Sequence, residues 1–258
     1  MILTADYHTH TVFSHGKGSI LDNAIAASER GLKEIGITDH GFAHPAFGLT
    51  AKKLPVMRRL CDEASAGTGV KVLLGIESNI IGTGGLTDLM PDRYEFFDIF
   101  LAGLHKLVKY KFGSMFSLGF PNLLFSTFKA KSVPKSLVKT NTKTVINVIK
   151  NNPVDVITHL NFCSYCDAEE VAKVAADYGT YIELNSKKVH LSDEELYRVV
   201  RTGVNFVIDS DAHSPDRVGD FKLVAETLER VEVPEERIHN VNGRFPTFRF
   251  KEFKEKNL

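Results

Sequence analysis

Short apolar runs alternate with longer stretches of helical periodicity along most of this chain. The runs are rich in Val, Ile, Leu and Phe, which is typical of strands covered on both faces. We predict seven strands, at residues 2–8, 33–38, 70–76, 98–104, 154–159, 180–185 and 204–209. Helical patterns occur at residues 19–30, 49–66, 142–151, 167–178, 192–202 and 221–231. This alternation predicts parallel strands joined by right-handed crossovers, in an open sheet or in a barrel.

The length and the missing motifs favour a barrel. A chain of 258 residues has a common size for one α/β barrel domain. It contains no Gly-x-Gly-x-x-Gly and no Walker loop, which argues against a nucleotide-binding open sheet. Because no internal repeat or low-complexity linker marks a boundary, we expect a single α/β domain over residues 1–258.

The charge balance limits the partners of the protein. Its 32 basic and 32 acidic residues leave no net charge, which excludes attraction of the whole protein to nucleic acid or an anionic membrane, but not a local basic surface. No apolar run approaches the about 18 residues of a spanning helix, and the N-terminus has no secretory signal pattern. We therefore expect a cytoplasmic protein without a membrane partner, and leave its oligomeric state open.

One segment departs from the alternation. Residues 99–154 contain no acidic residue but nine lysines. Within it, residues 110–134 are rich in Phe and Gly and lack clear periodicity, so we predict a Lys/Phe-rich insertion at about residues 106–140 that acts as a functional loop or lid. Three interpretations stay open: a lid that steers a phosphorylated substrate, a surface for single-stranded nucleic acid, or a solvated loop whose Phe side chains pack locally or on a partner subunit.

Histidines and carboxylates follow nearly every predicted strand. In a parallel barrel these strand ends meet on one face, where active sites lie. Residues two apart on a strand share a face, so His8 and His10 can point at one ion. The same spacing places Asp6 in phase with them, where it would orient an imidazole. The candidate metal ligands are His8, His10, His15, His40, Glu77, His105, His159, Asp211 and His213.

Nine ligands are too many for one ion, because a zinc site takes about four. Two or three ions that share a bridging carboxylate fit the number, and Glu77 is the only Glu among the candidates. Imidazole-rich ligation favours zinc, with manganese or iron as alternatives, over calcium or magnesium. Any single His here has an ordinary structural interpretation, but the whole cluster would be costly without cations.

In this order, the motifs around the candidate ligands resemble the PHP (polymerase and histidinol phosphatase) family. They are Asp-Tyr-His-Thr-His-Thr at residues 6–11, Thr-Asp-His-Gly at 38–41, Gly-Ile-Glu-Ser-Asn-Ile at 75–80, Gly-Leu-His at 103–105, Thr-His at 158–159 and Asp-Ser-Asp-Ala-His-Ser at 209–214. The resemblance covers about residues 6–241, and its wording at 75–80 and 236–241 is similar to the stand-alone bacterial phosphatase branch.

The resemblance implies a distorted seven-stranded (β/α)7 TIM-like barrel that holds three divalent transition-metal ions. The implied ligand sets are His8, His10, Glu77 and Asp211 for the first ion; Glu77, His105 and His159 for the second; and His15, His40 and His213 for the third. The chain departs from relatives at residues 160–162, where it has Leu-Asn-Phe in place of the frequent Pro-Gly, and in the long segment after His105.

This reading predicts a phosphoric monoester hydrolase acting on a small phosphorylated metabolite, with histidinol phosphate as one member of that class. A metal-bridging hydroxide would attack phosphorus beside Glu77 and Asp211. Arg217 and Lys106 are the candidates for substrate binding, although a lone loop Arg is more often a surface residue. Asp39 is the nearest candidate general acid, but an Asp next to a ligand is more often structural.

Other functions stay open. One alternative is a phosphodiesterase or exonuclease acting on single-stranded nucleic acid; another is a metal-dependent hydrolase of C–N or C–O bonds. Enzymes of the latter kind usually bridge their metals with a carboxylated lysine, so Glu77 favours phosphoesters. A non-enzymatic accessory module is a third, and the complete ligand set argues against it. Cys163 and Cys166 have no second pair to complete a zinc ribbon and are interpreted as ordinary buried thiols.

Overall fold

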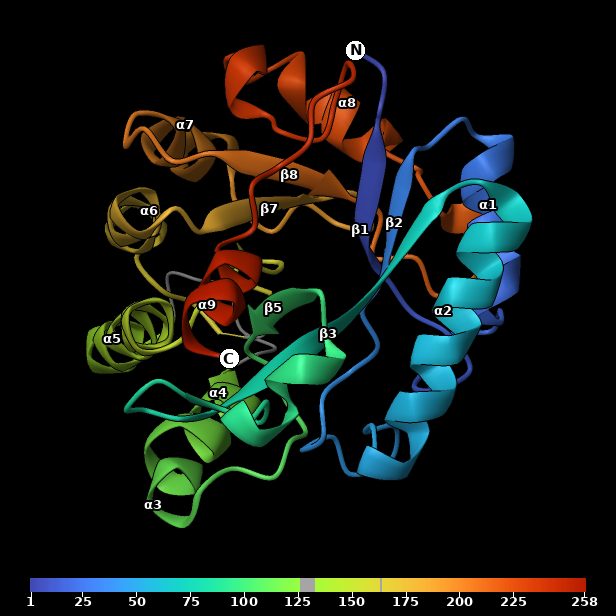
Figure 1. Cartoon of the computed structure of the whole chain (residues 1–258). Helices are drawn as coiled ribbons and strands as arrows, with labels where there is room; N and C mark the ends of the chain where they lie inside the picture. Colours follow the sequence, from blue (N-terminus) through green and yellow to red (C-terminus); the bar gives the residue numbers. More distant parts are fainter. Residues whose placement is uncertain (126–132, 163) are drawn as a thin grey trace.

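Seven parallel strands form a nearly closed barrel in the computed structural model (Figure 1). The structure describes residues 1–125, 133–162 and 164–258. The order around the barrel is β1-β2-β3-β5-β6-β7-β8, and β4 pairs antiparallel with the end of β3. The strands are β1 (Ala5–Thr9), β2 (Glu34–Ile37), β3 (Lys71–Gly82), β4 (Leu86–Thr87), β5 (Ile99–Gly103), β6 (Val156–Ile157), β7 (Tyr181–Asn185) and β8 (Phe206–Asp209). The predicted fold class is confirmed, and each predicted strand overlaps one of the seven parallel strands, although β1 and β3 extend beyond their predicted ends.

The barrel closes between β1 and β8. At the C-terminal end of these strands, Thr9 and Ala212 form a parallel bridge. At the other end, residues 238–242 lie between the two strands, with one bridge from Ile238 to Phe206 and another from Val241 to Leu3. This segment therefore completes the barrel where the direct ladder between β1 and β8 is missing.

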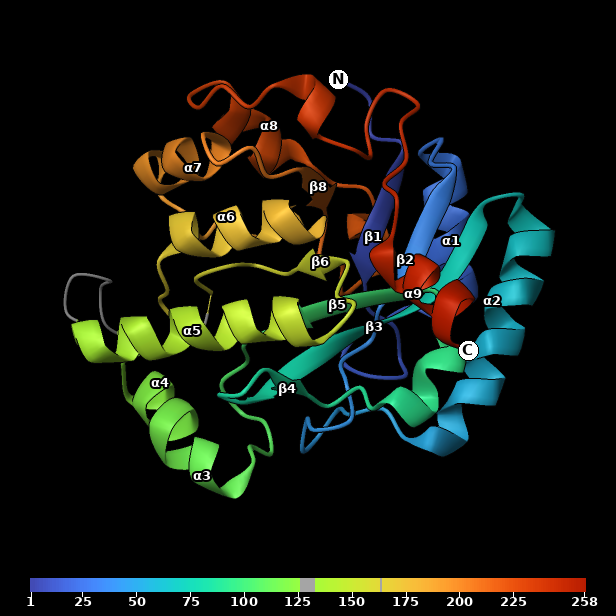
Figure 2. The ribbon, with the colours of Figure 1, turned by 60° about the vertical axis from the view of Figure 1, so that its left-hand side comes forward.

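Helices surround the strands (Figures 1 and 2). The longer ones are α1 (Ile20–Glu29), α2 (Leu54–Thr68), α5 (Lys135–Asn151), α6 (Ala168–Tyr178), α7 (Asp193–Val200), α8 (Lys222–Leu228) and α9 (Arg249–Asn257). The short ones are η1 (Ala51–Lys53), η2 (Pro91–Phe96), α3 (Phe112–Ser114), the π-helical η3 (Met115–Gly119), α4 (Phe120–Phe125), η5 (Pro215–Arg217) and η6 (Glu235–Arg237). Helix α9 packs at the N-terminal end of the barrel, where Phe250 N donates to Asp155 just before β6.

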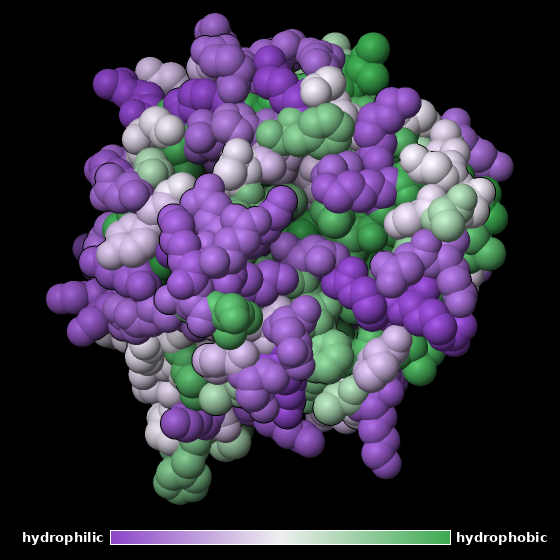
Figure 3. Space-filling model, in the orientation of Figure 1, coloured by the Kyte–Doolittle hydropathy of each residue, from purple (hydrophilic) through white to green (hydrophobic). Residues whose placement is uncertain are grey.

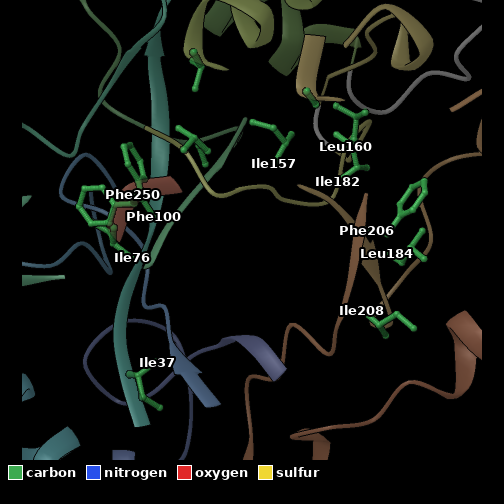
Figure 4. Close-up of a cluster of buried hydrophobic side chains, with 14 of the residues drawn as sticks. Ile37, Ile76, Phe100, Ile157, Leu160, Ile182, Leu184, Phe206, Ile208 and Phe250 are labelled. Atoms are coloured by element: carbon green, nitrogen blue, oxygen red, sulfur yellow. The ribbon is translucent and has the colours of Figure 1, made fainter. Parts of the chain in front are cut away.

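Alternate strand residues fill two apolar layers. One layer surrounds the ring of strands and packs under the helices (Figure 4); it includes Ile37, Ile76, Phe100, Ile182, Leu184, Phe206 and Ile208. The other forms a separate cluster on the opposite face of the strands and includes Ala5, Tyr7, Leu73, Ile99, Leu101, Val156, Tyr181 and Val207. Both faces of the strands are thus covered, as their nearly continuous apolar composition predicts.

The segment after β5 differs from the prediction. Residues 112–125 are helical rather than a structureless loop, and α5 begins at Lys135 rather than at residue 142. The helical spacing is present in Phe112, Phe116 and Phe120, but few polar residues alternate with them, so the amphipathic pattern that reveals a helix is weak. Residues 126–132 of the predicted loop lie outside the described residues. Among the described residues, no helix combines the length and the apolar character needed to cross a bilayer.

Candidate metal centre

Glu77, near the middle of β3, lies at the centre of a group of imidazoles from several strands. Its Oε1 atom lies 2.6 Å from His159 Nε2 and 3.0 Å from His105 Nε2. The same oxygen is 3.5 Å from His8 Nε2. Its Oε2 atom lies 2.7 Å from His40 Nδ1. One buried carboxylate therefore contacts side chains that follow or belong to four other strands.

Asp211, just beyond β8, forms the second focus. Its Oδ1 atom lies 3.4 Å from His10 Nε2 and 3.2 Å from His213 Nδ1. It is also 4.0 Å from His8 Nε2. The His15 ring lies farther out and is exposed, with its centroid 5.3 Å from that of His213. The structure thus brings eight of the nine candidates into one cluster and places His15 at its rim.

Three groups of these residues have donor atoms within 4.8 Å of one another: His8, His10 and Asp211; His40, Glu77 and His105; and His10, His40 and His213. The groups overlap the three implied ligand sets but differ in detail. His40 joins Glu77 and His105, and His10 stands in the third group where His15 was expected. Shared members make the cluster suited to several neighbouring ions rather than to isolated ones.

The prediction that Asp6 orients an imidazole is wrong. Its carboxylate accepts hydrogen bonds from Ser210 Oγ at 2.5 Å and Gly219 N at 2.7 Å. From His8 it accepts only the backbone N–H, at 3.4 Å, and not a ring nitrogen. The reason lies in β1, whose register with β2 shifts between Asp6 and Thr9. Such an irregularity breaks the two-residue alternation, so Asp6 holds the loop after β8 instead.

Glu183 on β7 performs the orienting role, and the sequence analysis missed it. Its Oε1 lies 2.5 Å from His8 Nδ1, and its Oε2 accepts the backbone N–H of His159 at 2.5 Å. Asn185 Nδ2 donates to the same Oε2 at 3.0 Å. A second carboxylate behind a ligating imidazole fixes its ring and raises its basicity. The available signal was a lone Glu inside an otherwise apolar strand, where an unpaired charge would be costly.

Two residues of the cluster have strained backbones. His159 has φ of 30° and Asp211 has φ of 49°. Non-glycine residues in this region cost about 1–3 kcal/mol each and persist only where the surroundings hold them. The bond from His159 N to Glu183 is one such restraint. This strain turns both side chains toward the cluster and indicates a functional constraint.

The electrostatics of the cluster fit bound cations. Burial opposes ionisation of Glu77, but the imidazoles around it, His105 foremost, hold its pKa well below the usual range. Burial and the neighbouring His40 hold the pKa of His10 well below its ordinary value, so this ring stays neutral, as a metal ligand must be. In the described part of the chain, Glu77 Oε2 is buried without a hydrogen-bond partner. Such an atom, facing the imidazoles of His10 and His40, is suited to a metal ion.

A cavity of about 300 Å³ opens above Glu77. Its wall includes two lysines and two apolar side chains, contributed by Lys106, Leu107, Phe162 and Lys187. Lys106 therefore lies where a substrate-binding residue was predicted. Lys187, which follows β7, places its Nζ 3.4 Å from Asp211 Oδ1 and 3.2 Å from His213 Nδ1. The cavity thus combines a carboxylate and imidazole floor with a cationic and apolar wall.

Two other candidates, and the thiol of Cys166, lie apart from this cavity. Arg217 forms an ion pair with Asp220 at 2.8 Å and borders a separate surface hollow. Asp39 accepts bonds from Thr11 N, Thr11 Oγ1 and Ser14 Oγ, so it organises the loop after β1 and faces no substrate space. Cys166 is a buried free thiol that contacts Asn161, and Cys163 lies outside the described residues.

Comparison with known proteins agrees with this geometry. The PHP domain model matches residues 6–187. A "probable phosphatase" of Caldanaerobacter subterraneus subsp. tengcongensis is 32% identical over 256 residues, covering 93% of this chain and 88% of the relative. A "probable phosphatase" of Clostridium novyi is 31% identical over 252 residues, covering 92% and 90%. The fold is similar to the histidinol phosphate phosphatase of Lactococcus lactis, solved with zinc, L-histidinol and phosphate; the TM-score is 0.65 and the identity 16%, covering 97% of this chain and 99% of that one.

Proposed function

Because this chain belongs to the PHP domain family, we propose that it is a metal-dependent phosphatase that hydrolyses a phosphate monoester of a small metabolite. The observation that carries this proposal is the contact of one buried carboxylate, Glu77, with the imidazoles of His8, His40, His105 and His159. Relatives named as phosphatases, at 31–32% identity across nearly the whole chain, support the reaction class.

Three divalent transition-metal ions are the proposed cofactors, with zinc as the first choice and manganese or iron as alternatives. The proposed ligands are His8, His10, His15, His40, Glu77, His105, His159, Asp211 and His213. Seven imidazoles with only two carboxylates suit zinc better than magnesium or calcium. The zinc reported in the structurally similar Lactococcus enzyme is consistent with this choice.

When bound, such ions neutralise phosphate oxygens and lower the pKa of water, which suits phosphoester hydrolysis. The protein itself supplies binding and orientation. Lys106 and Lys187 line the cavity and would bind the phosphate oxygens that face away from Glu77. Leu107 and Phe162 would pack against the organic half of the substrate. Glu183 holds His8 in place through its ring nitrogen.

The test combines metal analysis with a substrate panel. Protein purified without added metal should contain two or three transition-metal ions per chain, lose activity on chelation and regain it with zinc or manganese. It should hydrolyse phosphomonoesters, with histidinol phosphate included, in preference to phosphodiesters, single-stranded DNA and amides. Glu77→Ala should abolish turnover, whereas Glu252→Ala, an exposed site on α9, should not.

Three results would each overturn the proposal. Less than about one transition metal per chain would remove the multinuclear centre. Cleavage of diesters or DNA without cleavage of monoesters would assign the metal centre to a nuclease, and cleavage of amides alone to a C–N hydrolase.

A further inference from the structure

Residues 112–125 form a helical arm beside the mouth of the barrel, made of α3, η3 and α4. In Figures 1 and 2 this arm projects beyond the strands and the other helices. Four large apolar side chains recur along it at every fourth position and stay exposed: Phe112 at 83%, Phe116 at 61%, Phe120 at 54% and Leu124 at 63%. Figure 3 shows a hydrophobic protrusion at the lower left, where Figure 1 places α3. Contiguous exposed apolar surface of this kind marks an interaction site.

The inner face of the arm is fixed, so the stripe cannot turn inward without loss of contacts. Leu118 is fully buried in the main core. Gly119 lies so close to the Tyr110 ring that an added Cβ would come within 2.8 Å of it. Asn122 and the α5 residue Asn141 exchange two amide hydrogen bonds of 2.8 Å each. The outward direction of the Phe stripe is therefore built into the fold.

Two lysines adjoin the stripe, and the segment that carries it contains no acid. Lys109 and Lys111 lie directly before the arm, and both are exposed. Lys135, Lys139 and Lys143 are exposed on the neighbouring helix α5. Lys139 and Lys143 lie on the opposite side of that helix from Asn141, which contacts the arm. Among the described residues, none of these five lysines forms an ion pair, and residues 99–154 contain no Asp or Glu. The arm thus presents an apolar stripe within a region of one charge sign.

The apolar stripe and the adjoining lysines favour one kind of binding partner over the others. Bases stack on open aromatic faces, but the Phe rings pack on one another: Phe112 and Phe116 lie 5.8 Å apart at 78°, and Phe116 and Phe120 lie 5.8 Å apart at 56°. A second copy would bring two sets of unpaired lysines together. An anionic lipid surface, in contrast, accepts apolar side chains at the headgroup boundary and attracts flanking lysines.

We propose that the arm and its lysines dock the protein onto an anionic lipid surface. This goes beyond the proposed function, and it replaces the expectation of no membrane partner, which rested on net charge and on the absence of a spanning helix. Leu107, which is 62% exposed, lines the cavity and precedes the arm by five residues. Docking through the arm would therefore hold the cavity mouth beside the lipid surface.

The first experiment uses the absence of tryptophan from the chain. Phe116→Trp places a single fluorophore on the stripe, and Tyr197→Trp, at an exposed site on α7, is its matched control. With vesicles of phosphatidylcholine and phosphatidylglycerol, the emission of Phe116→Trp should shift to the blue and be quenched by brominated lipid. Pure phosphatidylcholine vesicles should cause at most a tenth of this partitioning, and Tyr197→Trp should not respond.

The second experiment is flotation of the full-length protein with the same vesicles. Phe112→Ser/Phe116→Ser should lower binding at least tenfold through loss of the apolar contact. Lys109→Gln/Lys111→Gln should also lower it at least tenfold, since each interfacial lysine contributes roughly fivefold. Both should still hydrolyse a soluble phosphomonoester, so loss of docking and failure of the proposed function are distinguishable. The proposal is overturned by equal binding to both kinds of vesicle or to neither. It is also overturned if the Phe variant abolishes a dimer instead, or if oligo-dT shifts the tryptophan emission and the vesicles do not.

Discussion

Glu77 is the residue whose loss should disturb the metal centre most, because its two oxygens contact four imidazoles. His15 lies at the rim. We expect Glu77→Ala to lose about two of three metal equivalents and His15→Ala about one at most. Elemental analysis of both variants after identical purification measures this difference. Equal losses would show that Glu77 is not a shared ligand.

Glu183 offers a subtler test, because it contacts His8 and the His159 backbone without belonging to any of the three donor groups. Replacing such a carboxylate lowers metal affinity by about 10- to 100-fold in known sites. We expect Glu183→Gln to weaken zinc binding by a similar factor, measured by competition with a chelator dye. Glu194→Gln, at an exposed site on α7, is the control. Unchanged zinc affinity in Glu183→Gln would mean that Glu183 only accepts the backbone N–H of His159 and does not influence the metal ligands.

At the scale of elements, local pattern predicts the strands well and the arm poorly. Each parallel strand produces its own apolar run, and the polar residues in or after its C-terminal half mark the face that carries the cluster, so eight members of the cluster could be placed from sequence. The register shift in β1 is not visible in sequence, since it depends on pairing with β2, and this is why the role of Asp6 was wrong. Glu183 was hidden because its partner, His8, is 175 residues away. The arm was hidden because its exposed face is apolar, which reverses the usual pattern.

The junction of α9 with the barrel predicts a pH dependence of stability. Asp155 accepts Phe100 N and Phe250 N at 2.9 Å each. Burial raises the pKa of Asp155 from 3.8 to about 7, although the two hydrogen bonds favour the ionised form and lower the pKa. Between these values the folded protein holds a proton that the unfolded chain has lost, so the free energy of unfolding falls as pH rises, by up to about 4 kcal/mol.

In Asp155→Asn the side chain cannot ionise, so the variant should lack the part of the fall in unfolding free energy that Asp155 causes. We expect the difference in unfolding free energy between wild type and Asp155→Asn to change between pH 4 and pH 7 and to level off above, as measured by urea denaturation. Subtracting the variant cancels the histidines, which titrate in both proteins. Asp177→Asn, at an exposed site on α6, controls for the charge change. A difference that stays constant with pH would mean that Asp155 is ionised throughout.

At the scale of the whole molecule, the two ends of the barrel have separate tasks. The C-terminal end carries the strained backbones of His159 and Asp211, the buried Glu77 Oε2 atom without a hydrogen bond, and the exposed arm. None of these features stabilises the folded protein. The N-terminal end carries the α9 junction and the segment 238–242 that closes the barrel. Stability concentrated at one end allows the other to hold costly groups, which is the usual division in α/β barrels.

Asn240 tests this division, because it joins β1 to β8 at the N-terminal end. Its Nδ2 donates to Ala5 O at 2.8 Å and Ile208 O at 2.6 Å, and its Oδ1 accepts Ile208 N at 2.9 Å. Asn240→Ala would leave these buried backbone groups unpaired, which should cost about 3 kcal/mol of unfolding free energy. Metal content and phosphatase activity well below the melting temperature should stay unchanged, since no contact of Asn240 reaches Glu77 or Asp211. Asn257→Ala, near the exposed end of α9, is the control for loss of an amide. If Asn240→Ala released metal while the protein remained folded, closure of the barrel and assembly of the metal centre would be one event, and the separation of the two ends would be wrong.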